Sequence, residues 1–215
     1  MNESVDFALM AFTSLFSMLN PVGLIPVFIS LTSGLSPKEA RKVAIKATTT
    51  AFIILVTFAL LGKFIFDFFH ISVNGLKIVG GVIFFITGYD MLQAHISRIK
   101  ESPDDDPNEN LEYANDIAIT PLAIPMLCGP GAITLSIVLM SEAGSVGNKM
   151  ILISILIIIL LIDLISFISG RKIMNFIGDN GNKVMMRIMG LIIMVISVEL
   201  FFNGLKPIVQ DILKL

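Results

Sequence analysis

Residues 150–161 read MILISILIIILL, an almost unbroken apolar run in which Ser154 is the one polar residue. With its flanks, this run predicts a helix long enough to cross the hydrocarbon core of a bilayer, which takes about 20 residues. Five further apolar stretches of comparable length occur along the chain. The sequence therefore predicts an all-α membrane protein with six transmembrane helices, at about 5–31, 43–69, 74–94, 117–141, 149–170 and 185–206.

The composition of the 215 residues agrees with this prediction. Hydrophobic residues make up 55% of the chain, charged residues only 15%, and the mean hydropathy is +0.88. Soluble domains carry about 25% charged residues, because their surfaces must be covered by groups that favour water. The net charge of −2 offers no basic field for a phosphate backbone. These numbers argue against a soluble enzyme, a disordered protein and a nucleic-acid binder, and they make the lipid bilayer the expected surroundings.

The basic residues predict how the helices are oriented. If the N-terminus lies outside, ten of the fifteen Lys and Arg residues fall on the cytoplasmic side. Because basic residues stay preferentially in the cytoplasm, the chain is predicted to be N-out and C-out. The N-terminus is acidic and lacks a basic segment, so the first apolar stretch is interpreted as a retained span and not as a cleaved signal peptide.

The two halves of the chain are weakly similar. KIVGGVI at 77–83 corresponds to RIMGLII at 187–193, 110 residues later, and Pro21 corresponds to Pro130, 109 residues later. Each half contains three spans, so the second half enters the membrane from the opposite side, as in many transporters. We therefore expect a single transmembrane domain made of a first three-helix repeat (1–94), a polar cytoplasmic linker (95–116) and a second, inverted three-helix repeat (117–215).

Prolines single out the first and fourth spans. Five of the nine prolines lie in the apolar parts of these two spans, near Asn20-Pro21-Val22-Gly23 and Cys128-Gly129-Pro130-Gly131. Proline removes a backbone donor and clashes with the preceding turn. In lipid, the freed carbonyl groups must face protein or a wet cavity. The sequence therefore predicts that helices 1 and 4 are broken at mid-membrane, and that the repeat brings the two breaks to one site.

The broken ends predict what such a site would bind. Half-helices beginning near Val22 and Ala132 present free N–H groups that suit a carboxylate, and the ends near Leu19 and Leu127 present carbonyl groups that suit an ammonium group. A small zwitterion such as an amino acid fits both, and the glycines leave room for it. Asn20 and the glycines rank above the hydroxyl groups, which often bond only to their own helix. The candidate substrate-binding residues are Ser17, Asn20, Pro21, Gly23, Thr120, Gly129, Pro130, Gly131 and Thr134.

Three acidic residues lie inside apolar stretches, where charge is costly and functional roles are common. Asp90 and Glu199 sit near opposite membrane faces and are almost related by the repeat, so they are candidates for gating or proton coupling. Asp163 lies deeper, about thirteen residues into its span, which makes it the better candidate for coupling. The coupling ion would be H⁺ or Na⁺.

LNPVGLIPVF at Leu19–Phe28 and ITPLAIPMLCGPGAIT at Ile119–Thr134 resemble the two signature segments of the MarC family of bacterial and archaeal inner-membrane proteins, which includes the SnatA-type transporters of small neutral amino acids. The resemblance covers essentially the whole chain. It implies a six-helix fold of two inverted repeats, location in a prokaryotic inner membrane, and transport of glycine, alanine or similar amino acids driven by a proton or sodium gradient.

Secondary transport is one of several functions that broken membrane helices can serve. An ion or small-solute channel can use the same broken helices and remains the alternative. An intramembrane enzyme is disfavoured because the sequence has no Ser–Lys pair, histidine-rich zinc motif or paired mid-span aspartates. An ATP-driven pump is disfavoured because the sequence has no Gly-rich loop of the phosphate-binding type. We expect no cofactor and no bound metal. Gly80, Gly81 and Gly88 could pack against a neighbouring helix of the same chain or of a homo-oligomer.

Overall fold

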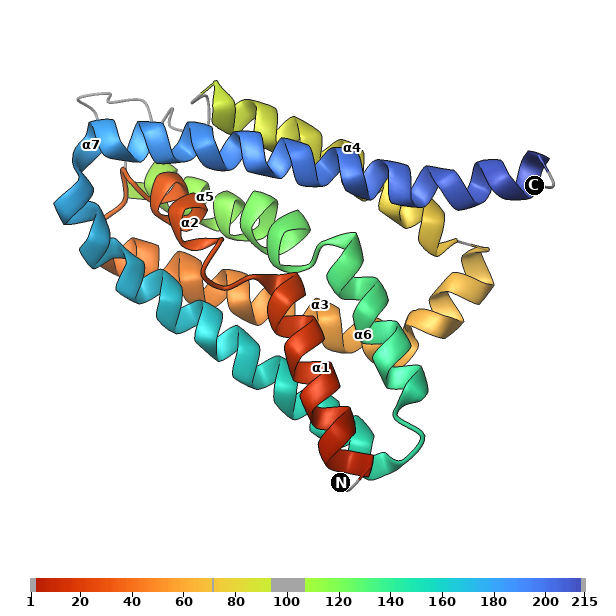
Figure 1. Cartoon of the computed structure of the whole chain (residues 1–215). Coiled ribbons are helices and arrows are strands. Elements are labelled where there is room, and N and C mark those ends of the chain that lie inside the picture. Colours follow the sequence, from red (N-terminus) through yellow and green to blue (C-terminus); the bar gives the residue numbers. More distant parts are fainter. Residues whose placement is uncertain (1–2, 71, 94–106, 214–215) are drawn as a thin grey trace.

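The computed structural model describes residues 3–70, 72–93 and 107–213, and their regular structure is helical throughout (Figure 1). The order of elements is α1 (Glu3–Leu19), α2 (Ile25–Leu31), α3 (Pro37–Phe69), α4 (Val73–Leu92), α5 (Pro107–Ile117), η2 (Ala118–Leu127), α6 (Pro130–Glu142) and α7 (Val146–Leu213). The predicted all-α fold class is confirmed for this part of the chain.

Helices long and apolar enough to cross a membrane are fewer than the six predicted. Four single helices qualify in the described residues, and a pair bent by 58°, Glu112–Leu127 with Pro130–Glu142, gives a fifth if the two halves form one broken span. The predicted first span, 5–31, consists of α1 with 17 residues and α2 with seven. Neither helix reaches the roughly 20 residues that cross a bilayer alone. The single helices that qualify are Pro37–Phe69, Asn74–Leu92, Val146–Gly170 and Gly190–Leu213.

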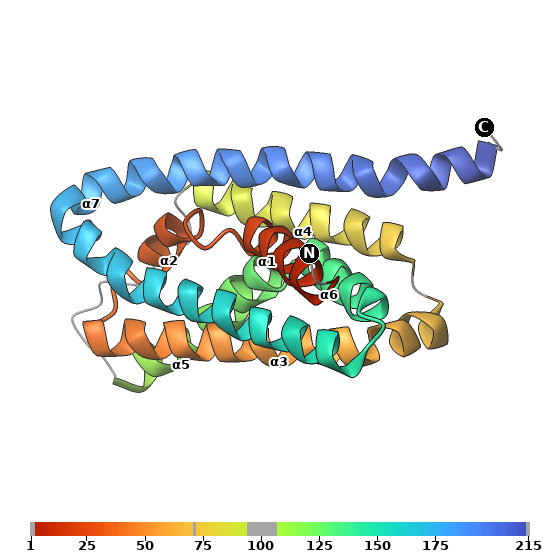
Figure 2. The same cartoon turned by 60° about the horizontal axis from the view of Figure 1, so that its bottom comes forward.

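The predicted spans at 149–170 and 185–206 belong to one helix, α7, of 68 residues. Figures 1 and 2 show that α7 turns sharply and that its second half runs back beside α4. The hydrogen-bonded backbone therefore continues through the polar stretch between the two apolar segments. The hydrophobicity of the sequence located the two apolar segments, but it could not show that the polar stretch between them is also helical.

Part of the predicted polar linker is also helical, which corrects the sequence interpretation. Residues 95–106 lie outside the described residues, but α5 begins at Pro107, a residue that suits the first turn of a helix. Three contacts hold α5 against the rest of the protein. Ala114 is buried, and the Tyr113 hydroxyl donates a hydrogen bond to the Leu31 carbonyl oxygen at 3.3 Å. Lys46 Nζ of α3 donates a hydrogen bond to Asn115 Oδ1 at 2.7 Å. These tertiary contacts hold a helix that composition alone did not indicate.

Local sequence accounts for where the long helices begin. Ser36 caps α3 in a capping box: its side chain accepts a hydrogen bond from the Glu39 N–H, and the Glu39 carboxylate accepts one from the Ser36 N–H at 2.8 Å. Ser72 caps α4 by accepting from the Gly75 N–H at 2.9 Å. Gly144, with φ of 63°, makes the left-handed turn between α6 and α7 that favours glycine.

Helices α4 and α7 pack with backbone against backbone in antiparallel directions. A Cβ atom built on Gly190 would lie 2.6 Å from the Gly88 carbonyl oxygen, and one built on Gly88 would lie 2.7 Å from the Gly190 carbonyl oxygen. Farther along, a Cβ on Gly204 would lie 2.6 Å from the carbonyl oxygen of Asn74. Such close approach is open only to glycine and is typical of helix pairs in membranes.

Gly80, Gly81 and Gly88, which could have indicated an oligomer interface, pack against other helices of the same chain. Gly80 touches the ring of Pro130 in α6, and a Cβ on Gly81 would lie 2.8 Å from the Ser197 carbonyl oxygen in α7. Gly88 faces Gly190, as described above. The predicted homo-oligomer therefore draws no support from these three residues.

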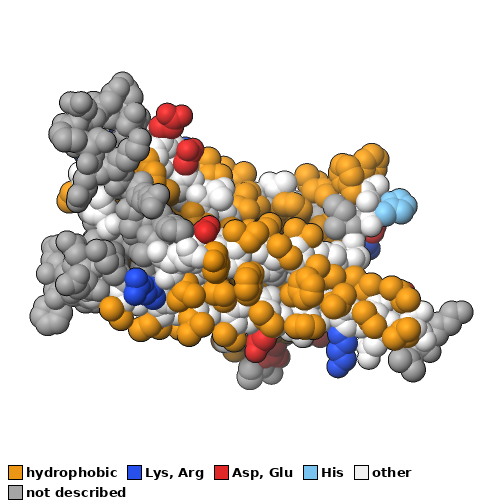
Figure 3. Space-filling model, turned by 90° about the horizontal axis from the view of Figure 1, so that it is seen from above, with side chains coloured by type: hydrophobic (Ala, Val, Ile, Leu, Met, Phe, Trp, Pro, Cys, Tyr) orange, Lys and Arg blue, Asp and Glu red, His pale blue; other side chains and the backbone are white. Residues whose placement is uncertain are grey.

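The outer surface suits a lipid environment. Large apolar side chains are exposed on several helices, with Phe64, Phe68 and Ile212 among them. On the face shown in Figure 3, hydrophobic side chains spread along the length of the described surface, and charged ones are few and scattered. A soluble monomer rarely exposes apolar area of this extent, which agrees with a multi-pass membrane protein.

Candidate functional site at the paired helix breaks

The first break lies where the sequence placed it, between α1 and α2. Asn20 adopts a left-handed backbone conformation with φ of 47°, which asparagine tolerates better than most residues. Its Oδ1 accepts a hydrogen bond from the Gly23 N–H at 3.2 Å, and Gly23 has no space for a Cβ beside the Asn20 amide. The side chain and the glycine together shape the turn. Pro21 is buried within it.

The half-helix after this break differs from the prediction. It was expected to begin near Val22, but α2 begins at Ile25, and Leu24 at its N-cap makes no side-chain hydrogen bond. It is only seven residues long, because the turn takes up residues 21–24 and Thr32 ends the helix. The helix-dipole argument for anion binding at this end is therefore weak. Ser17, a candidate hydroxyl, lies on the exposed side of α1.

The second break is longer and more irregular than the first. In η2, Thr120 and Ile124 have extended backbones (φ −128° and −124°), each directly before a proline, as expected for residues in that position. Cys128 closes the segment by donating its N–H to the Ala123 carbonyl oxygen at 2.8 Å. Thr120 itself is exposed. The irregular backbone produces the 58° bend before α6.

Helix α6 starts abruptly after this bend. Gly129 is its N-cap, with an extended ψ of 162°, and Pro130 occupies the first helical position. No side chain caps the first turn. The backbone N–H groups there have no partner from a capping side chain, so this end carries the partial positive charge of a helix N-terminus. Gly129 and Pro130 are buried.

The two breaks are in contact. A Cβ built on Gly131, in the first turn of α6, would lie 2.7 Å from the sulfur atom of Met18, in the last turn of α1. The C-terminal end of α1 therefore adjoins the N-terminal end of α6. Carbonyl groups at the first end and N–H groups at the second bring partial negative and partial positive charge close together. Sequence reasoning predicted this meeting of the breaks but did not single out Met18.

Helix α4 closes the other side of the second break. Gly80 packs on the ring of Pro130, and a Cβ on Gly129 would lie 3.2 Å from Cζ of Phe84. The expectation that glycines leave room here is wrong for this conformation, since the space beside them is filled by Phe84 and Met18. The predicted fourth span, 117–141, contains no aromatic residue, but Phe84 of α4 lies beside its break. Only the packing of α4 on α6 reveals it, because Phe84 is distant in sequence.

The hydroxyl groups near the break fall into two kinds. Ser136 donates to the Ala132 carbonyl oxygen at 2.8 Å, which is the back-bonding that needs no function. Thr134 Oγ1 is buried and has no hydrogen-bond partner. Thr134 lies three residues after Gly131, on nearly the same side of α6. A buried hydroxyl without a partner is costly, so Thr134 is the hydroxyl of this break best placed to serve a bound solute.

The three acidic candidates have different surroundings. Glu199 is exposed and Asp90 is half-buried, so the structure places neither in the interior. Asp163 is 0% exposed, and both of its carboxylate oxygens lack a hydrogen-bond partner. It lies on α7 rather than at either break. Its helix nevertheless contacts α2, because Phe167 stacks on Phe28 with ring centroids 4.7 Å apart.

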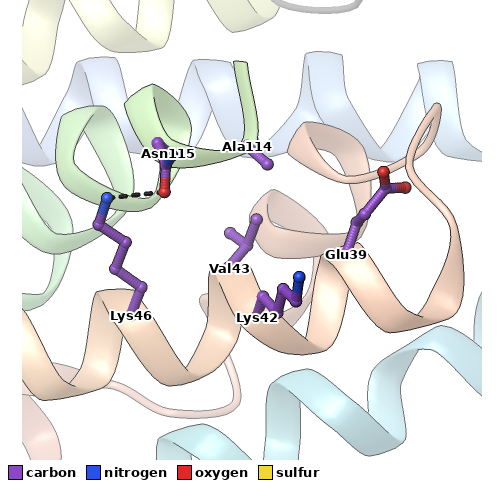
Figure 4. A pocket seen from close by; sticks show the side chains of 6 residues that line it. All are labelled: Glu39, Lys42, Val43, Lys46, Ala114 and Asn115. Atoms are coloured by element: carbon purple, nitrogen blue, oxygen red, sulfur yellow. Dashed lines mark hydrogen bonds between the residues drawn. The ribbon is translucent and has the colours of Figure 1, made fainter. Parts of the chain in front are cut away.

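A shallow surface pocket lies between α3 and α5, away from the predicted residues. Figure 4 shows Lys42 and Lys46 of α3 on one side and Asn115 of α5 on the other, with Lys46 bonded to Asn115. The pocket measures about 140 Å³. These two lysines are not among the site residues predicted from the sequence. In the described residues, no group of three or more His, Cys, Asp or Glu side chains could hold a metal ion.

Comparison with known proteins identifies the family. Residues 5–209 match the family described as MarC family integral membrane protein. A UPF0056 membrane protein of Methanocaldococcus jannaschii is 36% identical over 94% of this chain and 97% of its own length. Similar proteins of Pyrococcus abyssi (38% identical; 91% of this chain, 92% of the relative) and Bacillus subtilis (37%; 66% of each) carry the same description. No solved structure matches significantly. The chain is therefore a member of the MarC family of integral membrane proteins.

Proposed function

We propose that this protein is a secondary active transporter of small neutral amino acids, of the glycine and alanine class, coupled to an ion gradient in a prokaryotic inner membrane. The observation that carries the proposal is the contact between Met18 and Gly131, which brings the end of α1 to the start of α6. No catalytic step and no cofactor belong to this proposal.

The chemistry of the adjoining ends favours a zwitterion. An uncapped α6 N-terminus suits a carboxylate. Carbonyl groups at the end of α1, beside Asn20, suit an ammonium group. One substrate carrying both charges would satisfy both ends at once. Because Met18 and Phe84 fill the neighbouring space, only a small side chain would fit after modest movement of these two residues.

An inverted repeat would provide the movement. Helix α4 and the second half of α7 correspond at an offset of 110 residues, as Gly80 and Gly190 illustrate, and they pack antiparallel against each other. An antiparallel pair of corresponding helices is what a two-fold axis in the membrane plane would produce. In this proposal α1 and α2 together form the sixth span, both ends of the chain lie outside, and the repeats rock about the paired breaks.

A liposome experiment tests the function. Purified protein reconstituted with internal alanine or glycine should show saturable, stereoselective counterflow of external labelled substrate. A channel built on the same broken helices would instead conduct without saturation or exchange. Current without saturable counterflow would rule out the transporter and favour the channel.

Substitution of Asn20 should impair both the turn and transport. Asn20→Leu removes the acceptor of the Gly23 N–H and places a branched residue at φ of 47°, a backbone state that costs about 1–3 kcal/mol for such residues. We expect a lower unfolding temperature and at least about tenfold lower kcat/KM for counterflow, roughly 1.4 kcal/mol of transition-state stabilisation.

Asn20→Gly separates the two contributions, because glycine accepts the left-handed backbone without strain. This variant also loses the acceptor of the Gly23 N–H but avoids the backbone strain, so its unfolding temperature should lie between those of the wild type and Asn20→Leu, and it should lose part of its counterflow. If Asn20→Leu transports as the wild type does, the first break has no part in the site.

A further inference from the structure

Asp163 is the one acidic or basic residue that is fully buried among the side chains that the structure describes. Neither carboxylate oxygen accepts a hydrogen bond. An isolated charge in such surroundings would cost several kcal/mol even after the protein relaxes. A membrane protein retains an intramembrane acid of this kind when the group has a function.

The residues within one turn of Asp163 along α7 are apolar except for Ser166. Ile159 lies one turn before it and Phe167 one turn after it, and both are fully buried. Phe167 stacks on Phe28 of α2 with an angle of 9° between the rings. Three residues further, a Cβ on Gly170 would lie 2.6 Å from Cγ2 of Ile25, the first residue of α2. The helix face that contains Asp163 is therefore the face that holds α2 in place.

Among the side chains that the structure describes, no other charged group compensates Asp163. Helices α1, α2, α3, α4 and α6 all pack on α7. The charged residues described on α1 and α6 are exposed, and α2 has none. On α3, Lys46 donates to Asn115, Glu39 accepts a hydrogen bond from the Ser36 N–H, and the other charged side chains are exposed. The half-buried charges of α4 are Lys77 and Asp90, and neither pairs with Asp163, whose oxygens have no partner.

We propose that the Asp163 carboxyl group carries the coupling proton and that Phe167 transmits its state to α2, and hence to the first break; this inference rests on the proposed transport function. The carboxylate takes one proton from water on one side of the membrane and returns it to water on the other, and no other bond changes. Hard metal cations are held by several oxygen ligands, and among the described residues Asp163 belongs to no group of three or more His, Cys, Asp or Glu side chains that could hold a metal ion. The surroundings therefore favour a proton.

The coupling follows from the packing. With its proton bound, Asp163 is neutral and can stay in the apolar contact between α7 and α2. Without it, the charge must reach water or a cation, so α7 must shift relative to α2. The Phe28–Phe167 stack and the Gly170–Ile25 contact would then open. Because α2 follows Asn20–Leu24 directly, this shift changes the first break.

Asp163→Asn tests the proposal in proteoliposomes, since asparagine has the shape of the protonated acid but cannot release a proton. It should leave counterflow within about threefold of the wild type while abolishing accumulation driven by a pH gradient. Asp67→Asn, at an exposed acid of α3, is the matched control and should accumulate substrate normally. Gradient-driven accumulation by Asp163→Asn at the wild-type level would overturn the proposal.

Infrared spectroscopy tests the proton site without relying on transport. The wild type should show the carbonyl band of a protonated carboxyl group at neutral pH, and Asp163→Asn should lack it while Asp67→Asn retains it. Absence of this band from the wild type would overturn the proposal. If the band is present but wild-type protein shows no counterflow, the proposed transport function fails while the proton site stands.

Discussion

Gly190→Val is expected to prevent the normal packing of α4 on α7. A Cβ at Gly190 would lie 2.6 Å from the Gly88 carbonyl oxygen and 2.7 Å from the Leu92 nitrogen. Both are backbone atoms in a helix, which cannot rotate away as a side chain could. The helices must therefore separate, and contacts along their whole shared length weaken. Overpacking costs about 1–3 kcal/mol where side chains can adjust, and we expect at least about 3 kcal/mol here because they cannot.

The measurement is thermal unfolding of the purified protein in detergent. A loss of about 3 kcal/mol corresponds to a decrease of roughly 6–12 °C in unfolding temperature for a chain of this size. Gly147→Val is the matched control on the same helix, because its new Cβ would meet only the Ser145 hydroxyl at 3.8 Å. Both substitutions replace glycine by valine, a residue of higher helix propensity, so intrinsic propensity does not explain a loss of stability in either. Equal unfolding temperatures for the two variants would show that the backbone contact contributes little.

The contact between α4 and α7 illustrates what the sequence could and could not predict. Small residues at Gly80, Gly81 and Gly88 indicated a close-packed face, and the match between 77–83 and 187–193 related the two helices. The partner of each glycine could not be predicted, because a glycine in the sequence indicates that another helix can approach closely but not which helix does. The structure assigns Gly88 to Gly190 and Gly80 to Pro130.

The positions of the helix breaks could be predicted from local sequence, but the residues that line the breaks could not. Proline and glycine act on their own turn, so Pro21 and Pro130 located both breaks. The start of α2 at Ile25 depends on how Asn20 bonds to Gly23, which composition does not determine. Phe84 reaches Gly129 from another helix, through packing that no local pattern encodes.

For Asp163, too, the sequence predicted the local feature but not the tertiary contacts. Its position deep in an apolar run predicted burial, because no helix end is near enough for the carboxyl group to reach water. The missing hydrogen-bond partner could not be predicted, since a lysine or hydroxyl from any of the packed helices could have supplied one. The stack of Phe167 on Phe28, which connects this helix face to α2, is likewise a tertiary contact.

Gly131→Leu should abolish amino-acid transport while the protein still folds. The new side chain would enter the contact between the start of α6 and the end of α1, where a Cβ alone would lie 2.7 Å from the Met18 sulfur. The end of Met18 is flexible and half-exposed, so it can move aside, and the fold survives. The leucine would occupy the space proposed for the substrate. We expect counterflow at least about 100-fold below wild type, the scale of loss when a reacting or bound group is displaced by about 1 Å.

Two further variants distinguish a filled site from a displaced helix. Gly131→Ala adds only the Cβ that Met18 can accommodate, so it should lower counterflow far less than leucine does. In the double variant Met18→Ala with Gly131→Leu, the clash with α1 is removed but the leucine remains. If the site lies between these two helix ends, the double variant should regain the unfolding temperature of the wild type and still fail to transport. Recovery of counterflow in the double variant would mean that leucine acts by pushing α1 away, and the substrate site would have to be sought elsewhere.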